Sequence, residues 1–108
     1  MNESATRPLY SKLGADPDLS DIVTMFVEEM PDRISKILNQ LNASDWEGLR
    51  RSAHQLKGAA GSYGFDAISP SAARLEDSIL ESLPEQQICV AVDGLVEMCR
   101  RARSGSPS

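Results

Sequence analysis

Residues near the middle of the chain combine a nucleophile, a cation and two gaps in the side-chain surface. His54 is the only histidine among the 108 residues, and Lys57, Gly58 and Gly61 follow it within "AHQLKGAAGSYGF", residues 53–65. A neutral imidazole is a good nucleophile near pH 7, because its ordinary pKa is about 6.5. A lysine one helical turn away can neutralise phosphoryl oxygens, and glycines leave room for a second protein's reacting group. These residues therefore indicate phosphoryl chemistry shared with a partner.

Helical periodicity predicts that His54 points away from the core. The predicted buried face of its helix consists of Leu49, Ala53, Leu56, Ala60 and Tyr63. At 100° per residue, His54 lies about 140° from Leu49 around the helix axis, and Lys57 lies about 80° from it. Gly64 fits the left-handed position just after a helix end. The other glycines cost about 1 kcal/mol each inside a helix, which suggests a purpose other than stability.

The segments before this helix also carry helical patterns. Leu9 and Leu13 share an i,i+4 face, which predicts a short N-terminal helix. A longer apolar stripe keeps its phase from residue 18 to residue 42. Pro31 interrupts it by removing one backbone donor. We therefore expect one long helix over 18–42, kinked at Pro31.

Start signals place the remaining helices. Ser44 and Glu47 have the spacing of a capping box, so the His54 helix is expected over 45–63. A further helix begins between residues 66 and 70. Pro84 opens the last one, which closes near residue 103.

Together these elements predict an all-α fold. Four amphipathic helices with short connections favour an antiparallel up-down four-helix bundle, with the short N-terminal helix added. No segment is a convincing strand, and no linker is long enough to divide the chain. We expect a single domain over 1–108, with the bundle over about 18–103 and a disordered tail over 104–108.

Composition and charge exclude several functions. The net charge is −5, which gives nucleic-acid binding no electrostatic support. No stretch approaches the roughly 18 apolar residues of a membrane span, and the N-terminus lacks the apolar core of a signal peptide. Cys89 and Cys99 lie too far apart along one helix to pair, and they are expected to be small apolar residues in a reducing compartment. These features predict a cytoplasmic protein.

Motifs of other chemistries are missing or fail in detail. The sequence contains no Ser/Cys–His–Asp set and no metal-ligand cluster. The order in "LKGAAG" is the reverse of a P-loop, in which Gly-Lys-Ser/Thr ends the loop. "GAAG" matches the GXXG of RNA-binding KH modules by letter only, because their strands are absent.

The segment "AHQLKGAAGSYGF" resembles the signature of histidine-containing phosphotransfer (HPt) domains. That signature has an exposed histidine, lysine at the third position after it, glycine at the fourth, and small residues beyond. The longer segment "FVEEMPDRISKILNQLNASDWEGLRRSAHQLKG" is also similar to the family, so the resemblance covers residues 18–103. It implies a histidine phosphotransfer protein of a two-component phosphorelay, and we expect a free-standing module.

The resemblance assigns roles to individual residues. His54 would accept a phosphoryl group from a receiver-domain aspartate and pass it to another receiver. Lys57 would neutralise phosphoryl charge, Gly58 would leave room for the receiver, and Gly61 matches a small-residue position on the same face. Glu76, 22 residues after the histidine, matches a polar position that touches the imidazole in the family. It is expected to accept the Nδ1 hydrogen and leave Nε2 as the nucleophile.

The expected partners are response-regulator receiver domains and a hybrid histidine kinase. Docking would use the exposed faces of helices 18–42 and 45–63 around His54, including the locally basic Arg50 and Arg51 and also Gln55, Gly58 and Gly61. The chain offers no magnesium site of its own, so Mg²⁺ is expected in the receiver, with no cofactor or metal bound here. A carrier that exposes its histidine has no need to dimerise, which favours a monomer.

One departure limits the function, and one alternative stays open. Autophosphorylating kinases carry an acidic residue directly after the histidine, whereas Gln55 stands here and no ATP-binding domain is visible. We therefore expect no autokinase activity. The alternative is a helical-bundle adaptor that binds a receiver or histidine kinase without carrying phosphate. A metal- or ligand-binding bundle is disfavoured because no inward polar cluster is apparent.

Overall fold

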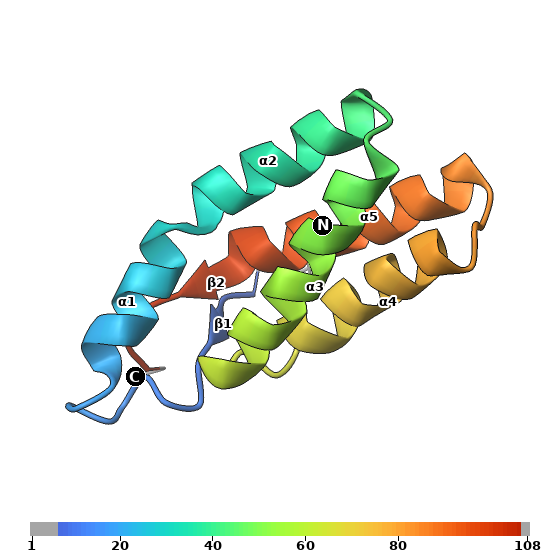
Figure 1. Cartoon of the computed structure of the whole chain (residues 1–108). Coiled ribbons are helices and arrows are strands. Elements are labelled where there is room, and N and C mark those ends of the chain that lie inside the picture. Colours follow the sequence, from blue (N-terminus) through green and yellow to red (C-terminus); the bar gives the residue numbers. More distant parts are fainter. Residues whose placement is uncertain (1–6, 107–108) are drawn as a thin grey trace.

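The computed structural model describes residues 7–106 and consists of packed helices with one pair of very short strands (Figure 1). The elements in chain order are β1 (Leu9–Tyr10), α1 (Ser20–Glu28), α2 (Met30–Asn42), α3 (Trp46–Ser62), α4 (Ile68–Leu80), α5 (Glu85–Arg101) and β2 (Ala102–Arg103). Helix α3 packs against α2 and α4, and α5 closes the bundle against the same two helices. Short connections turn the chain from each of these helices to the next (Figure 1).

The apolar face of α3 forms the centre of the core, as its periodicity predicts. Leu49, Ala53, Leu56 and Ala60 are each at most 1% exposed. Tyr63 was also expected there, but it is only half-buried at the last turn, where its ring lies 5.1 Å from that of Phe26. His54 is exposed on the other side of the helix.

The prediction of one continuous helix over 18–42 is wrong. Helix α1 ends at Glu28, and α2 begins at Met30, with Glu29 as the cap of both. Pro31 explains the break: it has no amide hydrogen for the carbonyl of Val27, and its ring crowds the preceding turn. The chain therefore changes direction just before the proline (Figure 1).

The predicted short N-terminal helix is also wrong, because Leu9–Tyr10 is a strand that pairs in parallel with Ala102–Arg103. The expectation that the chain has no strand fails with it. Ala102 leaves α5 with an extended backbone (φ −65°, ψ 134°), which offers unpaired peptide groups to the N-terminal segment. Leu9 packs its half-buried side chain on the core, so an isolated i,i+4 pair of leucines did not require a helix.

The described N-terminal and C-terminal segments meet beside this strand pair. Gly14 packs directly on Gly105, because a Cβ at Gly14 would lie 1.9 Å from the Gly105 carbonyl oxygen. Gly105 is part of the segment 104–108 that the sequence predicted to be a disordered tail, and it makes this contact. Residues 1–6 and 107–108 lie outside the described part of the chain.

The N-terminus of α3 is capped by Asp45, not by the predicted Ser44. The Asp45 carboxylate accepts the Gly48 amide hydrogen at 3.0 Å, while Ser44 has a positive φ of 54° in the preceding turn. Gly48 makes this cap possible, since a Cβ there would lie 2.2 Å from the Asp45 carboxylate. Glu47 is thereby free to interact elsewhere.

Gly64 lies just after the end of α3 in the left-handed conformation, as predicted, with a φ of +80°. The Phe65 amide donates to the Ala60 carbonyl at 2.8 Å, which closes the end of the helix in a Schellman motif. The N-terminal segment binds the same place, because the Lys12 amide donates to the Gly64 carbonyl at 3.1 Å and the Ser11 hydroxyl donates to the Tyr63 carbonyl. Gly64 therefore serves both the helix end and the segment that crosses it.

We predict that Gly64→Ala lowers the free energy of unfolding by about 1–2 kcal/mol, the cost of a left-handed backbone for a residue with a Cβ. The new methyl group would also lie 2.6 Å from the Ser11 hydroxyl. Urea unfolding measures the change. Gly94→Ala is the matched control: Gly94 is inside α5 with no atom within 4 Å of an added Cβ, so alanine should stabilise by up to about 1 kcal/mol. Equal effects of the two substitutions would contradict this account.

Candidate functional site

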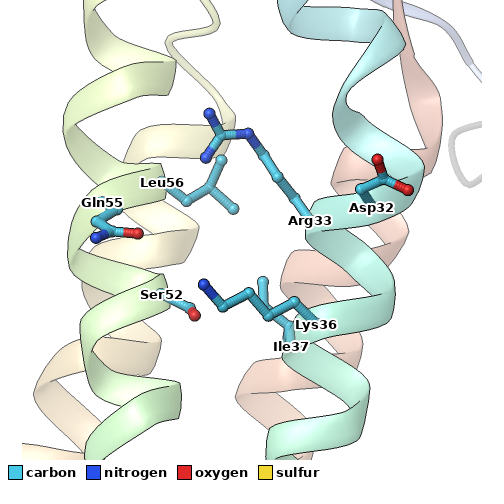
Figure 2. A pocket seen from close by; sticks show the side chains of 7 residues that line it. All are labelled: Asp32, Arg33, Lys36, Ile37, Ser52, Gln55 and Leu56. Carbon is cyan, nitrogen blue, oxygen red and sulfur yellow. The ribbon is translucent and has the colours of Figure 1, made fainter.

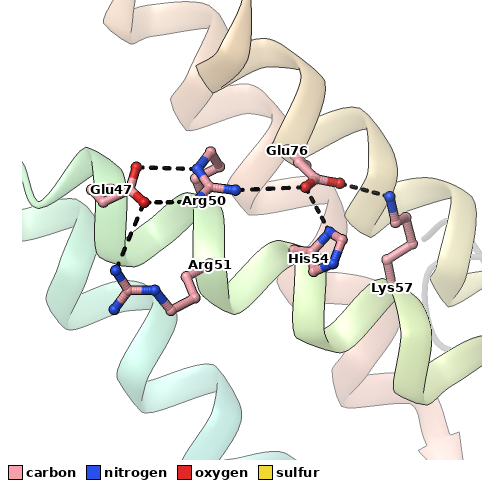
Figure 3. A network of polar contacts seen from close by, with 6 residues as sticks. All are labelled: Glu47, Arg50, Arg51, His54, Lys57 and Glu76. Carbon is pink, nitrogen blue, oxygen red and sulfur yellow. Dashed lines mark hydrogen bonds and ion pairs between the residues drawn. The ribbon is translucent and has the colours of Figure 1, made fainter.

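A buried carboxylate on α4 joins the side chains that the sequence singled out (Figure 3). Glu76 is 6% exposed, and its two oxygens have different partners. Oε2 lies 2.8 Å from Nδ1 of His54, and Oε1 accepts a hydrogen bond from Nζ of Lys57 at 2.7 Å. The expected contact between Glu76 and the imidazole is thus present, and Lys57 shares the same carboxylate.

Packing of α3 on α4 sets this geometry. His54 and Lys57 are three positions apart on α3, so they lie on neighbouring turns of one helix face. Glu76 follows the fully buried Leu75 on α4, which keeps its carboxylate close to α3. The Ser69 hydroxyl donates to the Lys57 carbonyl at 2.9 Å and ties the two helices together beside the site.

The imidazole of His54 is held at one nitrogen and open at the other. Its side chain is 62% exposed, although Nδ1 contacts the buried carboxylate. An ionised carboxylate only accepts hydrogen bonds, so a neutral His54 in this contact carries its hydrogen on Nδ1. The lone pair is then on Nε2, at the far edge of the ring, where it can act as a nucleophile.

Glu76 is ionised at neutral pH despite its burial. The hydrogen bond from Lys57 lowers the pKa of Glu76 below its ordinary 4.5, and the hydrogen bond from His54 acts in the same direction. Burial works against both by favouring the neutral acid, but the sum is a lowered pKa. The site therefore keeps a negative charge directly behind the imidazole.

A second carboxylate anchors Arg50 on the N-terminal side of His54 (Figure 3). Glu47 accepts hydrogen bonds from Nη2 and Nε of Arg50 at 2.6 and 3.1 Å, and Arg51 lies 3.7 Å from the same carboxylate. The hydrogen bond from Arg50 lowers the pKa of Glu47. The other Arg50 terminal nitrogen lies 3.9 Å from Oε2 of Glu76. Sequence reasoning used Glu47 as a cap and missed this role, although its spacing to the two arginines signalled it.

The two glycines after Lys57 differ in their surroundings. A Cβ at Gly58 would have no atom within 4 Å, so an open space lies over α3 at this position. A Cβ at Gly61 would lie 3.6 Å from the Ser69 hydroxyl, so Gly61 faces α4. Gly58 therefore forms the clearing that the sequence suggested near His54, whereas Gly61 borders the neighbouring helix.

Gln55 faces a groove that the sequence did not predict (Figure 2). The groove lies between α2 and α3, has a volume of about 170 Å³, and is lined by Asp32, Arg33, Lys36, Ile37, Ser52, Gln55 and Leu56. Helical periodicity identifies the buried face of each helix, but it does not say which side chains line the gap between two of them. On the side of α3 next to His54 there is therefore a groove, to which α2 contributes the basic residues Arg33 and Lys36.

Two kinds of feature are absent from the described residues. Residues 7–106 contain no group of three His, Cys, Asp or Glu side chains arranged to hold a metal ion. Among these residues, no helix combines the length and apolarity that a bilayer crossing requires.

Comparison with known proteins identifies the family. The family model named Hpt domain matches residues 21–105, which is most of the chain, so the protein belongs to the Hpt domain family. Hpt domains are phosphocarrier modules of two-component phosphorelays, and they interact with receiver domains and histidine kinases. Neither the curated proteins nor the solved structures include a significant match.

We predict that Glu76 makes stability depend on pH in one direction. Its pKa is lower in the folded than in the unfolded chain, so its contribution is complete above about pH 4.5 and is lost as the pH falls through the folded value. The difference in unfolding free energy between the wild type and Glu76→Gln should therefore be largest near neutral pH and shrink under acid. Urea unfolding at a series of pH values measures it.

Lys57→Met tests whether Lys57 is the cause of the lowered pKa of Glu76. Removing the ammonium group removes the largest influence that lowers the pKa of Glu76. The pKa of Glu76 in the folded chain then moves back toward its unfolded value, so the acid-dependent part of its contribution to stability should be smaller than in the wild type. A wild-type difference that does not change with pH would contradict the account.

Proposed function

We propose that this chain is a histidine phosphotransfer protein that carries a phosphoryl group on Nε2 of His54. The observation that carries the proposal is the contact of 2.8 Å between Nδ1 of His54 and the buried Glu76 carboxylate, combined with an imidazole that is 62% exposed. This contact supports one tautomer and one accessible nitrogen. The proposal takes the packed helices α2–α5 as the antiparallel up-down bundle that the sequence predicted.

The transfer step follows from this geometry. The Nε2 lone pair attacks the phosphorus of an aspartyl phosphate on a receiver domain, the N–P bond forms, and the bond from phosphorus to the aspartate oxygen breaks. The aspartate leaves as a carboxylate, so no proton has to be removed from the ring. The phosphorylated imidazole keeps its Nδ1 hydrogen and becomes cationic, and the Glu76 carboxylate stabilises that charge. Passing the group to a second receiver is the same step in reverse.

Cations near His54 support the charged phosphoryl group. The Lys57 side chain is 37% exposed, and its flexible stem can bring the ammonium from Glu76 toward phosphoryl oxygens. Arg50 and Arg51 border the site on the preceding turn, held by Glu47. We assign them, with Gln55, Gly58 and Gly61, to contact with the partner.

The partner is proposed to supply the metal ion for the transfer step. We propose that receiver domains and a hybrid histidine kinase are the partners and that Mg²⁺ binds in the receiver's acidic pocket, where it neutralises charge during transfer. The chain itself is proposed to act as a cytoplasmic monomer without autokinase activity and without a cofactor.

The proposal predicts that phosphorylated receiver domains label this protein on His54. A panel of receivers carrying radioactive phosphate is mixed with the wild type and with His54→Gln. The wild type should acquire a label that is stable in base and labile in acid, and His54→Gln should acquire none. Receivers that bind the wild type without labelling it would favour the non-phosphorylated adaptor instead.

Two further variants test the roles around the histidine. Lys57→Met should slow labelling about 10- to 100-fold, because one electrostatic stabiliser of the transferred group is lost. Lys12→Met is its matched control, since Lys12 is exposed and pairs with Asp66 at 3.4 Å. Equal rates for the two lysine variants would remove Lys57 from the mechanism.

A further inference from the structure

We propose that the groove between α2 and α3 binds a carboxylate side chain of the partner receiver, and that Arg33 and Lys36 hold it (Figure 2). This inference rests on the proposed function, because the receiver is the partner that brings the phosphoryl group to His54. It adds a specific recognition site beside the reacting histidine. Gln55, the residue directly after His54, lines the groove and links the two places.

The Arg33 guanidinium carries a buried hydrogen-bond donor that has no acceptor among residues 7–106. This donor is its Nε. A buried donor without an acceptor costs free energy, so such atoms are rare in folded proteins. The guanidinium lies 5.4 Å from the ring centre of Phe26 and 3.6 Å from the exposed Glu29 carboxylate, contacts that leave Nε unsatisfied. A small turn of this side chain toward an incoming carboxylate would satisfy it.

Lys36 adds a second cation on the same side of the groove. It is exposed and forms no ion pair within 4 Å in residues 7–106. Figure 2 shows Lys36 and Arg33 extending from α2 toward α3, while Asp32 points away from α3. The Ser52 hydroxyl already donates to the Gln40 amide oxygen at 2.8 Å. The groove therefore holds two cations, of which only Arg33 has a carboxylate within 4 Å among the described residues, that of the exposed Glu29.

Its apolar floor favours a side chain over a free anion. Ile37 and Leu56 line the groove and are almost fully buried, at 2% and 1% exposed, so the base of the groove is apolar although little of it contacts solvent. An aspartate or glutamate side chain has this combination, with an apolar stem and a charged end. A guanidinium can also bind a carboxylate through two hydrogen bonds, which gives orientation as well as affinity.

Charge is mixed over the bundle, so the local arrangement of the groove decides which group it attracts. Exposed acidic residues occur on and between α1 and α2 at Asp21, Glu28, Glu29 and Asp32, and on α4 and α5 at Asp77, Glu85, Asp93 and Glu97. Between α2 and α3, however, Arg33 and Lys36 extend toward α3 while Asp32 points away from it (Figure 2). Such local complementarity to a carboxylate raises association rates and selects partners.

The experiment compares neutral and reversed charge at one exposed position. Binding of the 108-residue chain to a panel of receiver domains is measured by titration calorimetry for the wild type, Lys36→Gln, Lys36→Glu and Arg33→Gln. We expect about fivefold weaker binding for Lys36→Gln, about tenfold for Arg33→Gln, and a larger loss for Lys36→Glu than for Lys36→Gln. Arg74→Gln and Arg74→Glu are the matched controls, because Arg74 is an exposed residue of α4. We expect them to change the affinity about twofold or less.

Further measurements separate this inference from the proposed function and from folding. Phosphoramidate, a small phosphoryl donor, labels His54 without docking, so Lys36→Gln should be labelled at the wild-type rate. Urea unfolding identifies any variant that is merely unstable. Three results would each overturn the proposal that the groove binds a receiver carboxylate. They are wild-type affinity in both Lys36 variants, equal losses in Lys36→Glu and Arg74→Glu, and no binding of any receiver to the wild type. Failure of bound receivers to label the wild type would instead overturn the proposed function.

Discussion

The ion pair between Glu76 and Lys57 is the interaction on which the site depends. A carboxylate that is almost fully buried is costly unless cations and hydrogen bonds compensate its charge. Lys57 supplies the compensation at 2.7 Å, which leaves the other carboxylate oxygen for the imidazole of His54. Both contacts cross from α4 to α3, so they require these two helices to keep one register. The orientation of the histidine thus follows from a charge that the fold cannot leave unpaired.

Helix α3 serves different neighbours with different faces. Its apolar side fills the core with Leu49 and Leu56, its α4 side carries the histidine and lysine, and its α2 side opens on the groove beside Gln55. Gly58 leaves open space on the exposed surface. Because each face has a separate task, the reacting nitrogen can be exposed without weakening the core beneath it.

The sequence predicts the parts that depend on one helix at a time. Periodicity correctly placed His54 outward, and the left-handed preference of glycine correctly placed Gly64 just after the helix end. It failed where two neighbours compete: Ser44 and Asp45 are both good caps, and only the backbone turn decides between them. Glu76 was found through family resemblance and not from any pattern. The groove at Arg33 depends on how far apart two helices pack, which no local pattern contains.

The parallel pairing of Leu9–Tyr10 with Ala102–Arg103 has a consequence for folding. The helices of the bundle contact their neighbours across short connections, whereas this pairing joins segments at opposite ends of the described chain. Closing so long a loop costs entropy before any contact compensates for it. We therefore expect the strand pair to form after the contacts between neighbouring helices. We also expect such short strands to open locally, which hydrogen exchange would detect, while His54 on α3 stays in place.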